Sequence, residues 1–149
     1  MAIPESLNEE HAHLMEVMVR AVREEGALGE AARALEEVLH PHFLKEEELA
    51  LPPLGMLTVT GDEPTGNIDE IIALTERFGK ELPRMLEEHV MIAERSEVLS
   101  LEAKNAGKDE YADFARDLAH HAQLEEEVMY PASLLVGSYL RLWKASKKD

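Results

Sequence analysis

The chain has 149 residues, no cysteine, and a formal charge of −16 from 15 basic and 31 acidic side chains. The lack of cysteine excludes disulfides, thiol catalysis, iron–sulfur clusters and cysteine-bound zinc. So acidic a surface repels nucleic acid and anionic membrane, so neither is an expected partner. We expect one domain over residues 1–149, in the cytoplasm, because no leader or membrane-spanning apolar run is found.

Strong helix formers dominate the sequence, and apolar residues recur three and four positions apart, which predicts an all-α fold. The first predicted helix covers residues 4–25. The second covers residues 30–51, is bent at Pro41, and ends at Pro52. Residues 54–66 contain three glycines and a proline and are the long loop that we expect.

The second half of the chain repeats this organisation. We predict a helical piece over 67–78, a helix that carries His89, a helix from about residue 109 that carries His121, and a tail helix over 132–144. Breaks are expected at Gly79, Pro83 and Pro131. Short connections between amphipathic helices favour an antiparallel, up-down four-helix bundle, with 67–78 and 132–144 as accessory helices.

Two stretches, 79 residues apart, share one pattern: a histidine, three residues, three glutamates, three residues and a proline. They are His42–Pro52, with Glu46, Glu47 and Glu48, and His121–Pro131, with Glu125, Glu126 and Glu127. Upstream of each lies a Glu-Glu-His triplet, which ends at His11 in one case and at His89 in the other. The chain therefore reads as two copies of one helix pair.

The seven histidines divide into two groups. His11 lies on the apolar stripe of its helix, whereas His13 lies on a polar face. His40 points about 200° away from His42, and His120 has Pro41 as its repeat counterpart, so neither is a candidate ligand. The candidates are His11, His42, His89 and His121. A single inward histidine is ordinarily a hydrogen-bonded core residue, but four of them beside two carboxylates would be costly to bury unpaired.

A metal centre would remove that cost, and the helix geometry selects its carboxylates. A residue four positions after a histidine lies about 40° from its direction, and one five positions after lies about 140° from it. Glu46 and Glu125 are therefore the expected ligands, with Glu47 and Glu126 as alternatives. Mixed imidazole and carboxylate ligands suit iron, manganese or zinc. Six ligands suit two metal ions about 3.5–4 Å apart, with the four histidines terminal and both carboxylates bridging.

Residues near these ligands are assigned more modest roles. Asp117 lies one turn before His121 and is either a hydrogen-bond partner of that imidazole or a surface carboxylate. Tyr130 lies half a turn away from the direction of His121, so we interpret it as packing near Pro131 and not as a ligand. The tail helix could form a homodimer contact.

On these motifs the chain resembles the hemerythrin-like, or HHE cation-binding, domains over nearly its whole length. The matching motifs are Glu10-His11, His42-x-x-x-Glu46 with Pro52, Glu88-His89, and His121-x-x-x-Glu125 with Tyr130-Pro131. The resemblance implies a four-helix bundle that encloses a non-haem di-iron site. Such a site binds oxygen or a related small ligand, for sensing, storage or scavenging. Zinc or manganese could substitute for iron.

The sequence departs from oxygen-carrying hemerythrins at two positions. Ala93 stands where they add a histidine, and Glu125 follows His121 by four residues where they have an aspartate at the fifth. The set of four histidines and two glutamates resembles hemerythrin-like proteins linked to redox chemistry with nitric oxide, peroxide or oxygen, and to iron-centre repair. The chain lacks the cysteine-bearing N-terminal segment that the iron-centre repair proteins carry. The alternatives are therefore a redox enzyme acting on peroxide or nitric oxide, and a non-redox metal-binding protein.

Overall fold

The structure, a computed structural model, describes residues 3–58, 64 and 66–147. Its α-helices are α1 (Glu5–Val22), α2 (Gly26–Lys45), α3 (Ile68–Asn105), α4 (Asp109–Leu124) and α5 (Tyr130–Ser146). Two π-helices, η1 (Glu46–Ala50) and η3 (Glu125–Met129), and a 3-10 helix, η2 (Pro52–Thr58), complete the described elements. The predicted all-α class is confirmed. None of the helices in the described part is both long and apolar enough to cross a membrane.

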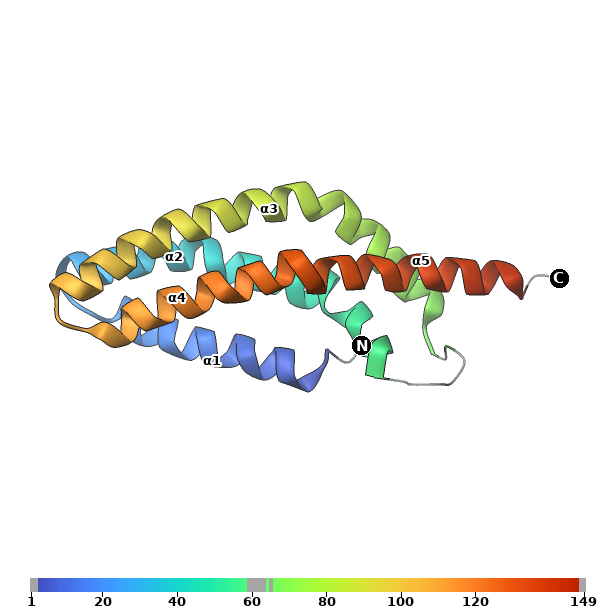
Figure 1. The fold of residues 1–149 in the computed structure, drawn as a ribbon, viewed down its shortest axis with the longest axis horizontal. Helices are drawn as coiled ribbons and strands as arrows, with labels where there is room; N and C mark the ends of the chain where they lie inside the picture. Colours follow the sequence, from blue (N-terminus) through green and yellow to red (C-terminus); the bar gives the residue numbers. More distant parts are fainter. Residues whose placement is uncertain (1–2, 59–63, 65, 148–149) are drawn as a thin grey trace.

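Helices α1 to α4 form a closed ring, in which α1 contacts α2, α2 contacts α3, α3 contacts α4, and α4 contacts α1. The colours in Figure 1 show that the chain reverses direction from each of these helices to the next. Helix α5 continues the line of α4 beyond the ring and packs against α3. The ring places the inner stripes of four helices opposite one another.

The third helix corrects the prediction of a break between residues 78 and 84. Helix α3 runs without interruption for 38 residues, through both Gly79 and Pro83. A proline inside a helix removes one backbone hydrogen bond and can bend the helix instead of ending it. Figure 1 shows α3 bent in its N-terminal half. The expected loop over 54–66 is also partly wrong, because residues 54–58 belong to η2, and most of its remainder lies outside the described residues.

The two π-helices occupy equivalent places in the repeat. Each begins at the glutamate four residues after the histidine, and each is followed, after one residue, by the proline of the motif. The backbone N–H of Leu51 donates to the carbonyl of Glu46, and that of Tyr130 donates to Glu125, which is the five-residue spacing of a π-turn. In a regular α-helix the proline ring would clash with the carbonyl four residues earlier. At Pro131 the helix continues beyond the π-turn as α5, so the predicted break there is wrong, whereas at Pro52 the helix ends as predicted and the 3-10 helix η2 begins. The extra residue of a π-turn also changes the direction of the side chains that follow it.

The hydrophobic core consists of two clusters, one on each side of the motif residues. One cluster contains Phe43, Ile92 and Leu118, together with most of the inner faces of α1 and α2. The other contains Leu49, Met85 and Tyr130, and extends along α3 and α5. On α3, His89 stands between Met85 and Ile92 in sequence. The polar side chains of the motif therefore form a layer between two apolar regions.

Candidate metal centre

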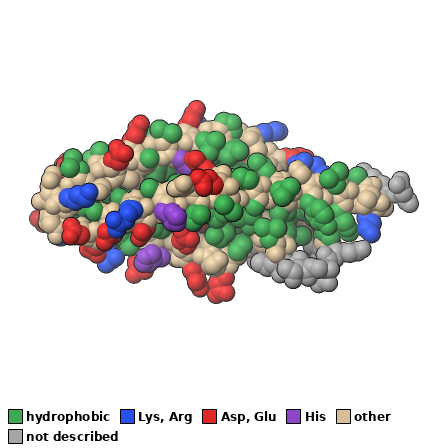
Figure 2. All heavy atoms as spheres, viewed as in Figure 1, with side chains coloured by type: hydrophobic (Ala, Val, Ile, Leu, Met, Phe, Trp, Pro, Cys, Tyr) green, Lys and Arg blue, Asp and Glu red, His purple; other side chains and the backbone are tan. Residues whose placement is uncertain are grey.

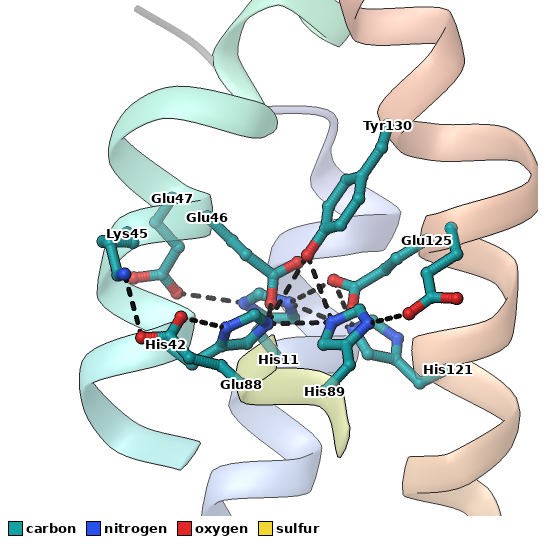
Figure 3. Close-up of polar contacts among 11 residues, drawn as sticks. His11, His42, Lys45, Glu46, Glu47, Glu88, His89, His121, Glu125 and Tyr130 are labelled. Carbon is teal, nitrogen blue, oxygen red and sulfur yellow. Dashed lines mark hydrogen bonds and ion pairs between the residues drawn. The ribbon is translucent and has the colours of Figure 1, made fainter. Parts of the chain in front are cut away.

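The four candidate histidines are all buried, one on each helix of the ring. His11 on α1, His42 on α2, His89 on α3 and His121 on α4 are 1–6% exposed. His13, His40 and His120 are exposed, as predicted. The helical period explains the contrast between neighbours such as His120 and His121, because adjacent residues point about 100° apart. All four buried imidazoles converge on one layer, together with Glu46 and Glu125 (Figure 3).

The Nε2 atoms of the histidines meet in two pairs. They lie 3.2 Å apart in the pair of His11 and His121, and 3.0 Å apart in the pair of His42 and His89. Glu46 places Oε1 2.9 Å from Nε2 of His42. Glu125 lies between the pairs, with Oε1 3.2 Å from Nε2 of His89 and Oε2 3.1 Å from Nε2 of His121.

These six residues form two sets of four donors that could each hold a metal ion. One set is His11, Glu46, His121 and Glu125, and the other is His42, Glu46, His89 and Glu125. Within each set the donor atoms lie within 4.8 Å of one another. Both glutamates belong to both sets. The structure therefore brings together all six residues selected from the sequence.

Each imidazole also contacts a carboxylate through its other nitrogen, Nδ1. The partners are Glu47 for His11 at 3.4 Å, Glu88 for His42 at 2.9 Å, Glu126 for His89 at 2.8 Å, and Glu10 for His121 at 2.6 Å. Every one of these carboxylates adjoins a site residue in sequence but reaches the imidazole of a different helix. Such outer carboxylates orient metal-binding histidines and raise their basicity.

The contacts at Nδ1 favour one tautomer of the neutral imidazoles. A neutral imidazole whose Nδ1–H donates to a carboxylate has an unprotonated Nε2. Burial lowers the pKa of His89 and of His121, which favours this neutral form. Burial opposes the charged form of His42 as well, but the adjacent carboxylates of Glu46 and Glu88 outweigh this and raise the pKa of His42. At His89 and His121, the unprotonated Nε2 of the neutral form therefore faces the carboxylate oxygens of Glu125.

This arrangement fits a pair of metal ions on the chemistry of its own atoms. Both oxygens of Glu46 and Oε2 of Glu125 are buried without a hydrogen-bond partner. Unpaired buried acceptors and facing lone pairs are costly, and a cation between them would satisfy both. The combination of nitrogen and carboxylate ligands suits iron, manganese or zinc.

Tyr130 is the site residue that the sequence analysis missed. Its hydroxyl donates to Nε2 of His89, 3.2 Å away, and also lies 3.4 Å from Nε2 of His42. Figure 3 shows the phenol ring of Tyr130 extending from α5 toward the histidine layer. Burial, followed by the charge of Glu46, raises the pKa of this phenol well above its ordinary value. The missed signal was the proline motif, because the π-turn before Pro131 turns Tyr130 inward.

The structure also shows where the remaining candidate residues lie. Asp117 is an exposed residue, and Glu10 occupies the Nδ1 position of His121 that Asp117 was considered for. Glu47 and Glu126, the alternative ligands, lie at the outer Nδ1 atoms of His11 and His89. Neither of them belongs to the two donor sets.

Solvent approaches the site between α3 and α4. A cavity of about 290 Å³ there is lined by His89, Ala93, Ala122 and Glu126, among others. His89 is the most exposed of the six central residues, at 6%. Alanine at positions 93 and 122 keeps the cavity open, and a histidine at 93 would project into it. Because so little of His89 is exposed, the cavity suits a small molecule as the ligand.

Comparison with known families agrees with this geometry. The sequence model of the family described as "Hemerythrin HHE cation binding domain" matches residues 2–133. Comparisons with curated proteins and with solved structures found no match. The matched segment includes all six central residues, the four outer carboxylates and Tyr130. It covers most of the chain, and this protein therefore belongs to the hemerythrin HHE cation-binding domain family.

Proposed function

We propose that this protein holds two iron ions in the buried site and binds oxygen or a related small ligand there. The observation that carries the proposal is the sharing of Glu46 and Glu125 by two donor sets, each of which has its own pair of histidines. Carboxylates that bridge two ions hold them about 3.5–4 Å apart, close enough to act on one small molecule. The bound irons would supply reversible redox chemistry and open coordination positions.

The surroundings of the site support a small ligand. The six central side chains are almost completely buried, and the cavity between α3 and α4 leads to the edge of one imidazole only. Apolar clusters lie on both sides of the histidine layer and would exclude bulk water. The outer carboxylates hold each imidazole with Nε2 directed inward.

The first experiment is metal analysis of the purified protein, followed by absorption spectra of the ferrous protein without and with air. Two irons per chain and a visible band that disappears on deoxygenation are the expected results. Rapid decay of the band with continued consumption of peroxide or nitric oxide would instead indicate an enzyme. Zinc, or no change with oxygen, would contradict the proposal and favour a non-redox metal-binding role.

Substitution of adjacent histidines tests the ligand assignment. We expect His121→Ala to lower the iron content below two per chain, because it removes a buried Nε2 donor. His120→Ala is the matched control, since His120 is exposed one residue earlier on the same helix. An unchanged metal content in His121→Ala, or in the corresponding His89→Ala, would refute the assignment.

A further inference from the structure

The two halves of the site are related by the sequence repeat, but their surroundings differ. The repeat aligns Phe43 with Ala122, and Leu51 with Tyr130. Phe43 stacks on the ring of His11 at a centroid distance of 4.0 Å, whereas Ala122 lines the cavity between α3 and α4. The His42–His89 half receives a phenol hydroxyl at a position that the repeat fills with leucine.

The Tyr130 oxygen lies at the spacing of a metal ligand. It is 3.2 Å and 3.4 Å from the Nε2 atoms of His89 and His42, which are themselves 3.0 Å apart. Neighbouring donors on an octahedral ion with bonds of about 2.1 Å are separated by about 3 Å. The three atoms therefore form a triangle that one ion could cap.

The position of this oxygen is fixed by packing. Tyr130 is 2% exposed. Its ring stacks on that of His89 at 5.6 Å and meets the ring of Phe78 edge-on at 5.1 Å. The π-turn directly before it directs the side chain toward Glu125 and the histidine layer. A rigid, buried oxygen so close to two ligand nitrogens is placed as a donor to the same ion.

We propose that Tyr130 is a fifth protein ligand, as phenolate, of the ion held by His42, His89, Glu46 and Glu125, and that the other ion has no counterpart to it. This inference rests on the proposed function. On coordination the phenol O–H bond breaks, its electron pair passes to the metal, and the proton leaves to water. A cation bound to the phenol oxygen favours loss of the proton, as a metal ion does for a coordinating thiol. The His42–His89 ion then keeps one open position fewer than its partner.

The test is the absorption and resonance Raman spectrum of the protein loaded with ferric iron. Phenolate bound to ferric iron gives a visible charge-transfer band, and excitation in that band enhances tyrosine ring vibrations. We expect both features in the wild-type protein and their loss in Tyr130→Phe, which retains the ring that packs on Phe78 and His89. Iron content is measured on each sample.

The chain offers two matched controls, because its remaining tyrosines lie elsewhere. Tyr111 is buried and donates to Glu24, and Tyr139 is 55% exposed on α5. Tyr111→Phe and Tyr139→Phe should both keep the band. Two irons per chain without the band, or a band that persists in Tyr130→Phe, would overturn the inference and leave the phenol protonated. Failure to take up iron would instead overturn the proposed function, and with it this inference.

Discussion

Glu125→Gln is predicted to have opposite effects on the metal-free and the metal-loaded protein. Glu125 is 1% exposed, and its Oε2 has no hydrogen-bond partner although it lies 3.1 Å from Nε2 of His121. Burial lowers the pKa of His121 and favours its neutral form, in which Nδ1–H donates to Glu10 and Nε2 carries a lone pair. Without metal, two acceptors therefore face each other. A glutamine amide in the same place could donate N–H to that nitrogen.

The size of the effect follows from the cost of an unpaired buried acceptor, which is about 1–3 kcal/mol. Repairing this contact should stabilise the metal-free protein by about that amount. A protein of this length gains about 2–4 °C in Tm for each kcal/mol. The metal-loaded wild type has an additional stabilisation of about 2.7 kcal/mol when free metal is at roughly 100 times its Kd. Glu125→Gln should lose most of this, because it removes a charged bridging ligand.

The assay is thermal unfolding of both proteins, first with chelator and then with saturating ferrous iron under anaerobic conditions. We expect Glu125→Gln to have the higher Tm without metal and the lower Tm with it. Glu127→Gln, on the same π-helix but exposed, is the control and should follow the wild type in both conditions. A metal-free Glu125→Gln that is less stable than the wild type would refute the argument about facing acceptors.

Three further predictions concern pH and packing. Metal binding needs unprotonated Nε2 atoms and ionised carboxylates, so the metal should be released as pH falls through the titration of the histidines. Metal that is still bound after dialysis at about pH 4 would contradict the proposed ligands. Burial and the hydrogen bond to Glu24 raise the pKa of Tyr111 to about 12. The stabilisation by the protonated phenol is therefore complete below the unfolded-state pKa of about 10 and is lost as pH rises toward 12. Urea unfolding should show this loss in the wild type but not in Tyr111→Phe. Gly137→Ala should destabilise the protein by about 1–3 kcal/mol, because the added Cβ would lie 2.1 Å from Oγ1 of Thr75 in the contact between α5 and α3. Gly79→Ala should stabilise it by up to about 1 kcal/mol, because the nearest atom to its added Cβ would be 3.9 Å away. If denaturant unfolding ranked the two variants in the opposite order, the contact between α5 and α3 would be wrong.

The surface of the protein agrees with the strongly acidic composition. Figure 2 shows acidic side chains scattered along the visible face of the ring, and a broad apolar area toward the α5 end. On α5, Leu135, Tyr139 and Leu142 are more than half exposed. A homodimer through this helix is a proposal that sedimentation of the purified protein can test.

The sequence by itself determined the helical class and the inward positions of the six central residues. These follow from local rules, since a period of 3.6 residues separates His11 from His13 and His121 from His120 regardless of what packs outside. The repeat added that two equal half-sites meet in one place. Neither conclusion required knowledge of how the helices are arranged in space.

Tertiary structure alone decided which carboxylate orients which imidazole. Glu10 contacts His121, and Glu88 contacts His42, across 111 and 46 positions of sequence. No spacing along one helix encodes such a pair, because it depends on the ring of four helices bringing separate segments together. For the same reason Asp117, a candidate by spacing alone, has no role at the site.

The position of Tyr130 depends on both the sequence and the tertiary structure. In a regular α-helix it would point about 140° away from Glu125, and the extra residue of the π-turn removes about 100° of that difference. Pro131 signals a disturbance of the helix in the sequence, but whether it ends, bends or widens the helix depends on the packing around it. At Pro83 the packed helix continues as α3, and at Pro131 it takes a π-turn. A proline removes one hydrogen bond in either case, and the surrounding contacts decide how the backbone compensates for it.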